Sequence, residues 1–265
     1  MDEMHPVVLH IPHTSVEIPD DCRRDIVLSD DDLRREILYM TDMHTGDLYQ
    51  YPGAERVEFP VSRLVLDPER FADDALETMA ARGMGVIYNV TSHLEKLRDV
   101  PTPEQRRALL GRFYYPHHKR LEDACERMIA ASDSEYCYIF DCHSFPSRAL
   151  PYEMRDPNED RPEICLGVDE FHAPPYMVDM AVRHFRERGY SVAINTPFAG
   201  ALVPMRYYRK NPRVYAMMFE IRRDLYMNED TGDKAQGFDR VRDDITAAID
   251  IITRRTSINK KAGSN

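Results

Sequence analysis

An aspartate, a cysteine and a histidine directly follow three apolar residues in the stretch YIFDCHS, positions 138–144. The apolar run is typical of a buried strand, whereas ionisable residues at its end indicate a functional position. Asp141 precedes His143 by two residues, so both side chains should point to the same side of an extended chain. A carboxylate placed there can orient a metal-binding imidazole. Alternatively, Asp141 caps the strand end and His143 is an ordinary hydrogen-bonded histidine.

Similar residues follow other apolar runs, and ligands of open α/β sheets collect at the carboxyl ends of strands. The residues at these positions are His10, His13, Asp67, Arg70, Asp141, His143, Asn195, Glu220, Arg222 and Arg223. Two histidines and a carboxylate can hold zinc and leave a fourth position for water, as catalytic zinc requires. His13 and His143 are 130 residues apart, so only the sheet topology would bring them together.

Two further charged residues lie in apolar surroundings. Glu220 ends the run AMMFE, where loss of water would disfavour its charged form and suit a general base. The alternative is a structural ion pair with an arginine. Arg63 lies inside the run VSRLVLD at 61–67, so it needs an anion from either the protein or a substrate. Asp67 and Arg70 can also simply pair with each other at the surface.

Seven short apolar runs predict the strands that would position these side chains. They are residues 6–11, 61–67, 85–90, 136–141, 163–168, 190–195 and 214–221. Several are apolar at successive positions, which is typical of strands covered on both faces. We therefore expect one sheet with helices on both sides.

Helical patterns lie between these runs. Ser29 is a suitable N-cap for a first helix, and Thr102 with Gln105 predicts a capping box for a second helix that Pro116 should kink. The apolar stripe of the first helix consists of Leu33, Ile37, Met40 and Leu48. A third helix is expected at 175–188, ending at Gly189, and the last carries the stripe Phe238, Val241, Ile245, Ile249 and Ile252. This alternation predicts an α/β fold, and the length suits one large domain.

Composition narrows the class of partner. The net charge of −11 argues against a nucleic-acid or anionic-membrane partner, because no basic face or long basic run is visible. No apolar stretch is long enough for a membrane span, and the acidic start MDEM is unlike a signal peptide. We expect a cytoplasmic protein that acts on a small molecule.

Other reactive residue types receive structural interpretations. The five cysteines form no CxxC pair, which indicates neither a disulfide framework nor a zinc thiolate cluster. Cys142 is a possible nucleophile, but its place in a strand favours packing. His44 is a possible extra ligand or polar contact, or a helix flank, and His117 and His118 are expected to be at the surface or partly buried.

Six blocks in order resemble the N-formylglutamate amidohydrolase family. They are HIPHTSVEIP, TDMHTGDLY, SRLVLDPERF, DCHS, NTPFAG and FEIRRDLYM, spread from about residue 7 to 227. The resemblance implies a zinc-dependent amidohydrolase with the phosphorylase/hydrolase-like fold, a three-layer α/β/α sandwich around a mixed, largely parallel sheet. The whole chain, 1–265, would form one catalytic domain. Family substrates are N-acylated acidic amino acids, typically N-formylglutamate in histidine degradation.

Residue by residue, the resemblance implies that His13 and His143 bind zinc. Asp42 is the preferred third ligand, and Glu17 is the alternative. Asp141 would orient His143, and Glu220 would act as general base. Substrate contacts are expected from Arg63, which would also assist catalysis, and from Arg70, Asn195, Thr196, Gly200, Arg222 and Arg223.

Three departures from the family pattern bear on the substrate. HTS replaces the usual HSG, Ala201 ends the PFxGG element, and Arg222 occupies an asparagine position. Alternative functions are therefore hydrolysis of another N-acyl amino acid or short peptide, or non-catalytic binding of a dicarboxylate. Imidazole and carboxylate ligands also accept divalent metals other than zinc.

Overall fold

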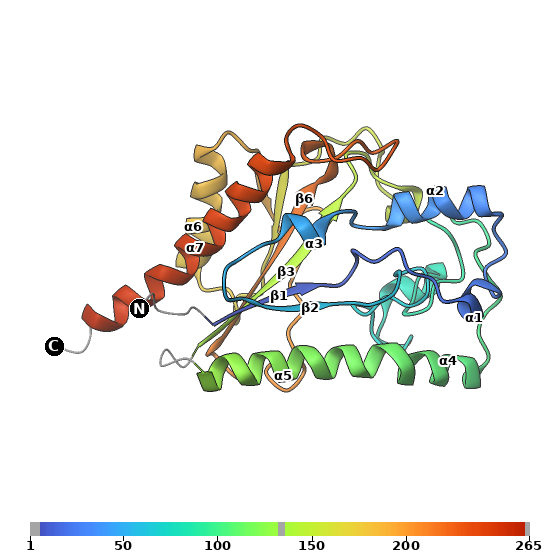
Figure 1. Cartoon of the computed structure of the whole chain (residues 1–265), viewed down its shortest axis with the longest axis horizontal. Helices are drawn as coiled ribbons and strands as arrows, with labels where there is room; N and C mark the ends of the chain where they lie inside the picture. Colours follow the sequence, from blue (N-terminus) through green and yellow to red (C-terminus); the bar gives the residue numbers. More distant parts are fainter. Residues whose placement is uncertain (1–5, 132–135, 263–265) are drawn as a thin grey trace.

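The computed structural model describes residues 6–131 and 136–262, and a six-stranded sheet forms its centre (Figure 1). The strands are β1 (Val7–Ile11), β2 (Glu55–Glu58), β3 (Cys137–Phe145), β4 (Ile164–Gly167), β5 (Val192–Ile194) and β6 (Val214–Arg222). Their order is β2-β1-β3-β6-β4-β5, and only the β4–β6 pair is antiparallel. The expected mixed, largely parallel sheet is confirmed.

Helices cover both faces of this sheet (Figure 1). One face packs against α5 (Tyr115–Ala131), and the other packs against α6 (Pro175–Glu187) and α7 (Phe238–Ala262). The short helix α3 (Thr45–Leu48) lies on the α7 side. Past the carboxyl ends of the central strands lie α1 (Asp20–Arg23), α2 (Asp30–Met40) and α4 (Pro103–Leu109) (Figure 1).

Strand alternation decides which face each polar residue occupies. In β3, Tyr138 and Phe140 belong to the core on the α7 side, whereas Cys137 and Ile139 belong to the core beneath α5. Asp141 continues the α5 side by the same alternation. The site residues of β3 therefore lie on the same side of the sheet as the apolar residues beneath α5, and they follow the last of those residues along the strand.

Two runs predicted as strands, 61–67 and 85–90, are instead turns and irregular chain. They are apolar because they form two small cores at the end of the molecule, and a single backbone bond from the Asp67 N–H to the Val86 carbonyl (2.8 Å) joins them. A short apolar run does not by itself distinguish a strand from other buried chain. The edge strand β2 was missed because only Val57 of its four residues is buried.

The two predicted helix N-termini are confirmed, but the helices are interrupted at other places than the sequence predicts. Ser29 accepts the Asp32 N–H, and Thr102 with Gln105 forms the capping box. However, α2 ends at Met40, so the predicted stripe does not continue as one helix to Leu48. Ahead of Pro116, residues Leu110–Tyr114 form a π-helical turn that joins α4 to α5.

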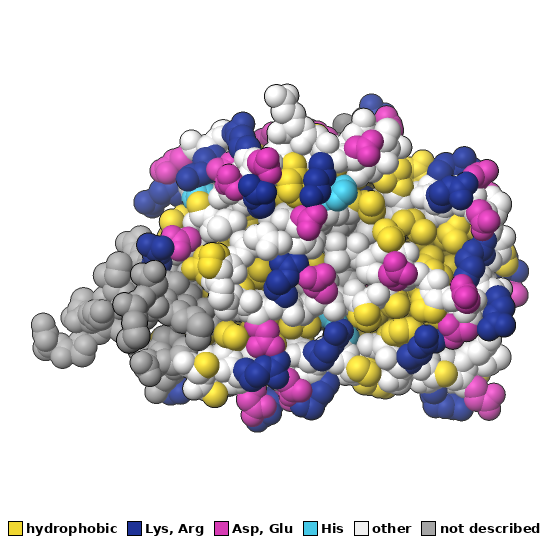
Figure 2. All heavy atoms as spheres, viewed as in Figure 1, with side chains coloured by type: hydrophobic (Ala, Val, Ile, Leu, Met, Phe, Trp, Pro, Cys, Tyr) yellow, Lys and Arg dark blue, Asp and Glu magenta, His cyan; other side chains and the backbone are white. Residues whose placement is uncertain are grey.

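The surface mixes charges of both signs (Figure 2). On the face in view, hydrophobic side chains gather toward the end of the molecule that carries α2. None of the described helices combines the length and apolar character that crossing a bilayer requires. All five cysteines are buried free thiols, and burial raises the pKa of Cys142 well above its usual value, which supports the packing interpretation.

Candidate metal centre and active site

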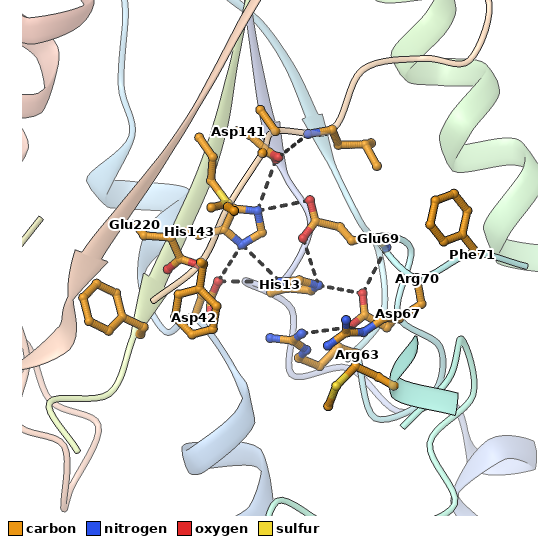
Figure 3. Close-up of a pocket in the computed structure, with 18 of the residues that line it drawn as sticks. His13, Asp42, Arg63, Asp67, Glu69, Arg70, Phe71, Asp141, His143 and Glu220 are labelled. Carbon is orange, nitrogen blue, oxygen red and sulfur yellow. Dashed lines mark hydrogen bonds and ion pairs between the residues drawn. The ribbon is translucent and has the colours of Figure 1, made fainter. Parts of the chain in front are cut away.

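His13, Asp42 and His143 converge at the carboxyl ends of β1 and β3 (Figure 3). The Nδ1 atoms of the two imidazoles lie 3.3 Å apart. The Asp42 Oδ2 atom lies 3.3 Å from the Nδ1 of His143 and 3.7 Å from that of His13. All three side chains are at least 97% buried. The topology therefore brings together the two histidines that are remote in sequence.

Hydrogen bonds on the outer side of each ring assign the tautomers. The His13 Nε2–H donates to the Asp67 Oδ1 at 2.9 Å. The His143 Nε2–H faces Glu69 Oε1 at 3.1 Å and Asp141 Oδ1 at 3.2 Å. Because a neutral imidazole carries one proton, both inward-facing Nδ1 atoms are left with lone pairs. Two such nitrogens 3.3 Å apart, beside a carboxylate, favour a positive charge between them, either a proton or a metal ion.

The carboxylates that surround the rings strengthen this preference for positive charge. Burial alone would lower the pKa of His143, but the charges of Glu69 and Asp141 raise it well above its usual value. Burial and Arg63 lower the pKa of His13, yet Asp67 and Asp42 raise it overall. The site therefore attracts positive charge, which either a proton or a metal ion can supply.

The donor set fits a divalent metal. Two imidazole nitrogens and one carboxylate oxygen are ligands that zinc accepts, and tetrahedral bonds of about 2.0–2.1 Å separate ligand atoms by about 3.3–3.4 Å. The observed separations are 3.3, 3.3 and 3.7 Å. Arg223 fixes the carboxylate by donating to the Asp42 Oδ1 at 2.9 Å, which leaves Oδ2 facing the imidazoles.

A neighbouring group of His10, Glu69 and Asp141 also combines ligand types, but its histidine presents a proton. The His10 Nδ1–H donates to the Asp141 Oδ1 at 2.7 Å, so the His10 Nε2 accepts the Nε2–H of His117 at 2.9 Å. Burial lowers the pKa of His117 well below its usual value, which keeps it neutral. This second group is therefore a hydrogen-bonded support for Asp141. His117 is fully buried, contrary to the exposed or partly buried position expected for it.

Glu220 lies opposite His143 in the β3–β6 register. It is 6% exposed and lines the same cavity, and its Oε2 atom has no hydrogen-bond partner in the described part of the chain. Burial raises the pKa of this carboxyl group to about 8. An unpartnered buried carboxylate oxygen is costly unless something else binds it. The ion pair that the sequence left open for Glu220 is not formed among the described residues.

The cavity that contains these groups has a volume of about 1120 Å³. It opens over the α5 side of β1, β3 and β6, and its walls come from the loop at 67–71, the start of α5 and the loop at 197–208. A model of the N-formylglutamate amidohydrolase family matches residues 5–227. The chain belongs to this family.

Solved structures agree with this N-formylglutamate amidohydrolase family assignment in fold. A crystal structure of N-formylglutamate amidohydrolase from Ralstonia eutropha JMP134 has a TM-score of 0.80 at 24% identity, covering 98% of this chain and 96% of that one. A gene product of Agrobacterium tumefaciens has a TM-score of 0.66 at 19% identity, with coverage of 94% and 91%. The comparison with curated proteins gave no match.

The arginines that family resemblance suggested as substrate contacts differ in availability. Arg63 donates to the Asp67 Oδ2 at 2.7 Å, and Arg223 donates to Asp42 and to the Tyr39 carbonyl. Both therefore bind protein acceptors that support the histidines. Arg70 lines the cavity, and its buried Nε has no hydrogen-bond partner among the described residues. Arg70 is the best placed of the three to bind a substrate anion.

Four suggested residues lie outside this arrangement. Asn195 and Thr196 do not line the cavity, because the Asn195 side chain closes a turn by accepting the Val168 and Gly200 N–H groups. Arg222 also lies outside, bonded to Asp224 and the Arg161 carbonyl. Glu17, the alternative ligand, is exposed.

Two further residues suggested by the sequence, Gly200 and His44, also differ in whether they line the cavity. Gly200 does line the cavity. His44 does not, and its Nε2–H donates instead to the Gly232 carbonyl at 2.6 Å.

Sequence reasoning missed the supporting roles of Asp67, Glu69, His10 and His117. The sequence left open a surface ion pair of Asp67 with Arg70, and these two residues do approach to 3.9 Å, but Asp67 is fully buried and accepts bonds from His13, Arg63 and Tyr88. Of these four residues, His10 and Asp67 gave a signal, because both lie at the ends of apolar runs. Alternation from Val8 places His10 beneath α5.

The His117–His10 bond gives a direct test of the hydrogen-bond chain. We expect His117→Leu to lower the free energy of unfolding by about 1–3 kcal/mol, because it leaves the buried His10 Nε2 without a donor. The matched variant His117→Gln keeps an N–H donor and should recover most of that loss. Urea unfolding measures both, and equal stability of the Leu and Gln variants would contradict the assigned bond.

Proposed function

We propose that this protein is a metal-dependent amidohydrolase that cleaves the N-formyl or N-acyl amide of a small amino acid, with N-formylglutamate as the reference substrate. The observation that carries the proposal is the pair of Nδ1 atoms of His13 and His143, which face each other 3.3 Å apart beside the Asp42 carboxylate. Family membership supports the reaction class. We further propose that one catalytic domain provides all of these groups, because they belong to one sheet and its loops.

His13, Asp42 and His143 would hold the metal ion, and Zn²⁺ is the ion that this donor set suits first. A divalent cation bound there lowers the pKa of water and polarises a carbonyl oxygen. Asp67 and Asp141 keep both Nδ1 lone pairs directed inward by accepting the outer N–H groups. Arg63 contributes by fixing Asp67, which is a positioning role.

Glu220 is the proposed general base. Its unpartnered oxygen faces the cavity beside His143. It would take a proton from the attacking water as the new C–O bond forms, and pass that proton to the amine nitrogen as the C–N bond breaks. The products from N-formylglutamate are formate and glutamate, so no further reactant is needed.

Arg70 is the proposed anchor for a substrate carboxylate. Its Nε lies 3.9 Å from Asp67 Oδ2, and the other oxygen of the same carboxylate accepts the His13 Nε2–H. The Arg70 Nη1 lies 3.6 Å from Glu77 Oε1, whereas its buried Nε has no hydrogen-bond partner among the described residues, and a guanidinium can bind a substrate carboxylate by charge-assisted hydrogen bonds. The alternative of a non-catalytic dicarboxylate-binding protein is disfavoured by the proximity of Glu220 to the metal ligands, since binding alone needs no unpaired base.

Metal removal tests the proposed centre. Protein stripped with a chelator should lose formate release from N-formylglutamate and regain it when Zn²⁺ is returned. His143→Ala should abolish stoichiometric Zn²⁺ binding, whereas the matched control His44→Ala should keep it because that ring lies outside the site. Full activity of a sample shown by elemental analysis to be metal-free would overturn the proposal.

Glu220→Gln separates proton transfer from metal binding. We expect kcat to fall by about 10²–10⁴-fold, the range that general base catalysis contributes, while metal content remains one ion per chain. The substitution keeps side-chain size, so the thermal midpoint should not decrease. A kcat within threefold of the unmodified protein would remove Glu220 from the mechanism.

A further inference from the structure

Three large apolar side chains on the cavity wall expose more than half of their surface to solvent. Phe71, Tyr115 and Met205 expose 52%, 56% and 66% of their surface and line the same cavity as the histidines. We call these three residues the apolar annex. Single exposed apolar residues are ordinary, but several that converge on one concave site indicate a ligand.

The annex is assembled from three separate segments that the structure ties together. The Tyr114 hydroxyl donates to the Arg70 carbonyl at 3.1 Å, which joins the start of α5 to the loop carrying Phe71. Arg206 Nη1 lies 3.5 Å from Glu122 Oε1, which joins the loop carrying Met205 to α5. The π-helical turn Leu110–Tyr114 immediately precedes Tyr115, and such turns are frequent at functional sites.

The loop that carries Met205 is also anchored to the metal-centre residues. The Leu202 N–H donates to the Asp141 Oδ2 at 2.7 Å. Gly167 allows the loop to approach, because a Cβ at this position would lie 2.1 Å from the Gly200 carbonyl oxygen. The annex is therefore a built extension of the active-site cavity. The cavity volume of about 1120 Å³ exceeds the roughly 300–1,000 Å³ of ordinary small-molecule sites.

The charges on the wall limit what fills this space. Arg70, directly beside Phe71 (Figure 3), has a buried Nε without a hydrogen-bond partner, and its guanidinium lies 3.9 Å from Asp67 Oδ2 and 3.6 Å from Glu77 Oε1. The other cationic side chains of the wall already have partners. Arg63 and Arg223 bind Asp67 and Asp42, Lys119 binds Asp123, Arg155 lies near Glu159, and Arg82 donates to the Tyr152 carbonyl. Among the described cationic side chains of the wall, Arg70 is thus the one with an unused buried N–H donor, next to an apolar surface.

We propose that the preferred substrate is an N-acylated amino acid with a single carboxylate and an aromatic or long aliphatic group. The carboxylate pairs with Arg70, the apolar group occupies the annex, and the amide lies at His13, His143 and Glu220. This inference rests on the proposed amidohydrolase function and narrows its substrate class. The apolar group can belong to the amino acid or to the acyl part, and both place the same chemistry against Phe71, Tyr115 and Met205.

A panel of three substrates tests the inference on the metal-loaded full chain. N-formylphenylalanine carries the apolar group on the amino acid, N-hexanoylglycine carries it on the acyl part, and N-formylglutamate carries no apolar group and a second carboxylate. We expect kcat/KM for one of the two apolar substrates to exceed that for N-formylglutamate by at least tenfold, since even a single methylene in an apolar pocket is worth about tenfold or more.

Matched variants connect the preference to the annex. Met205→Ser should reduce the ratio of kcat/KM between the preferred apolar substrate and N-formylglutamate about tenfold. Met154→Ser is the control, because Met154 is 67% exposed and lies outside the cavity wall; it should leave the ratio unchanged.

The outcomes separate this inference from the function on which it rests. If N-formylglutamate is hydrolysed as well as or better than both apolar substrates, the annex proposal is wrong and the amidohydrolase function stands. If the metal-loaded protein hydrolyses none of the three, the proposed function itself is overturned. If Met205→Ser leaves the ratio of kcat/KM between the apolar substrate and N-formylglutamate unchanged, other residues cause any apolar preference and the annex proposal is wrong.

Discussion

The site depends on two imidazole nitrogens that face each other beside a carboxylate and that carry lone pairs when both rings are neutral. Each ring of His13 and His143 is held in this state from outside, by carboxylates that accept its Nε2–H. Those carboxylates are themselves fixed, Asp67 by Arg63 and Asp141 by His10. If an outer acceptor were lost, the ring could rotate or change tautomer, and the inward lone pair would no longer be assured.

The parallel sheet brings these side chains together although they are far apart in the sequence. Residues two apart in a strand share a face, and neighbouring parallel strands place their carboxyl ends together. His10, Asp141 and Glu220 therefore reach the same side of the sheet from three adjacent strands, β1, β3 and β6. Helix α5 covers the apolar part of that face, and its first turns pass over the polar part, where His117 contacts His10. The apolar end of this face therefore stabilises the fold by packing against α5, and its polar end carries the site residues.

Sequence reasoning succeeds where a local pattern has one structural outcome. The run at 136–141 predicts a strand, and the two-residue spacing of Asp141 and His143 predicts a shared face; both are confirmed, with Asp141 Oδ1 3.2 Å from His143 Nε2. It fails where burial is irregular. Residues 61–67 have the composition of a strand but form turns, and this is why the buried contact of Asp67 with His13 was not foreseen.

Long-range polar pairs were the other class that escaped prediction. No local pattern links His117 to His10, 107 residues away, because their contact depends on where α5 crosses β1. Asn195 looked like a pocket residue, but its side chain and left-handed backbone, φ 54°, form a turn. Arg222 follows Glu220 in strand register, yet the strand ends there and the guanidinium turns toward Asp224.

The most direct test of the facing lone pairs is anomalous X-ray scattering from a crystal equilibrated with Zn²⁺ and measured at the zinc absorption edge. We expect one strong peak bounded by the Nδ1 atoms of His13 and His143 and by the Asp42 carboxylate. A peak among His10, Glu69 and Asp141 instead, or no peak in a crystal that diffracts well, would contradict the tautomers assigned to the two rings.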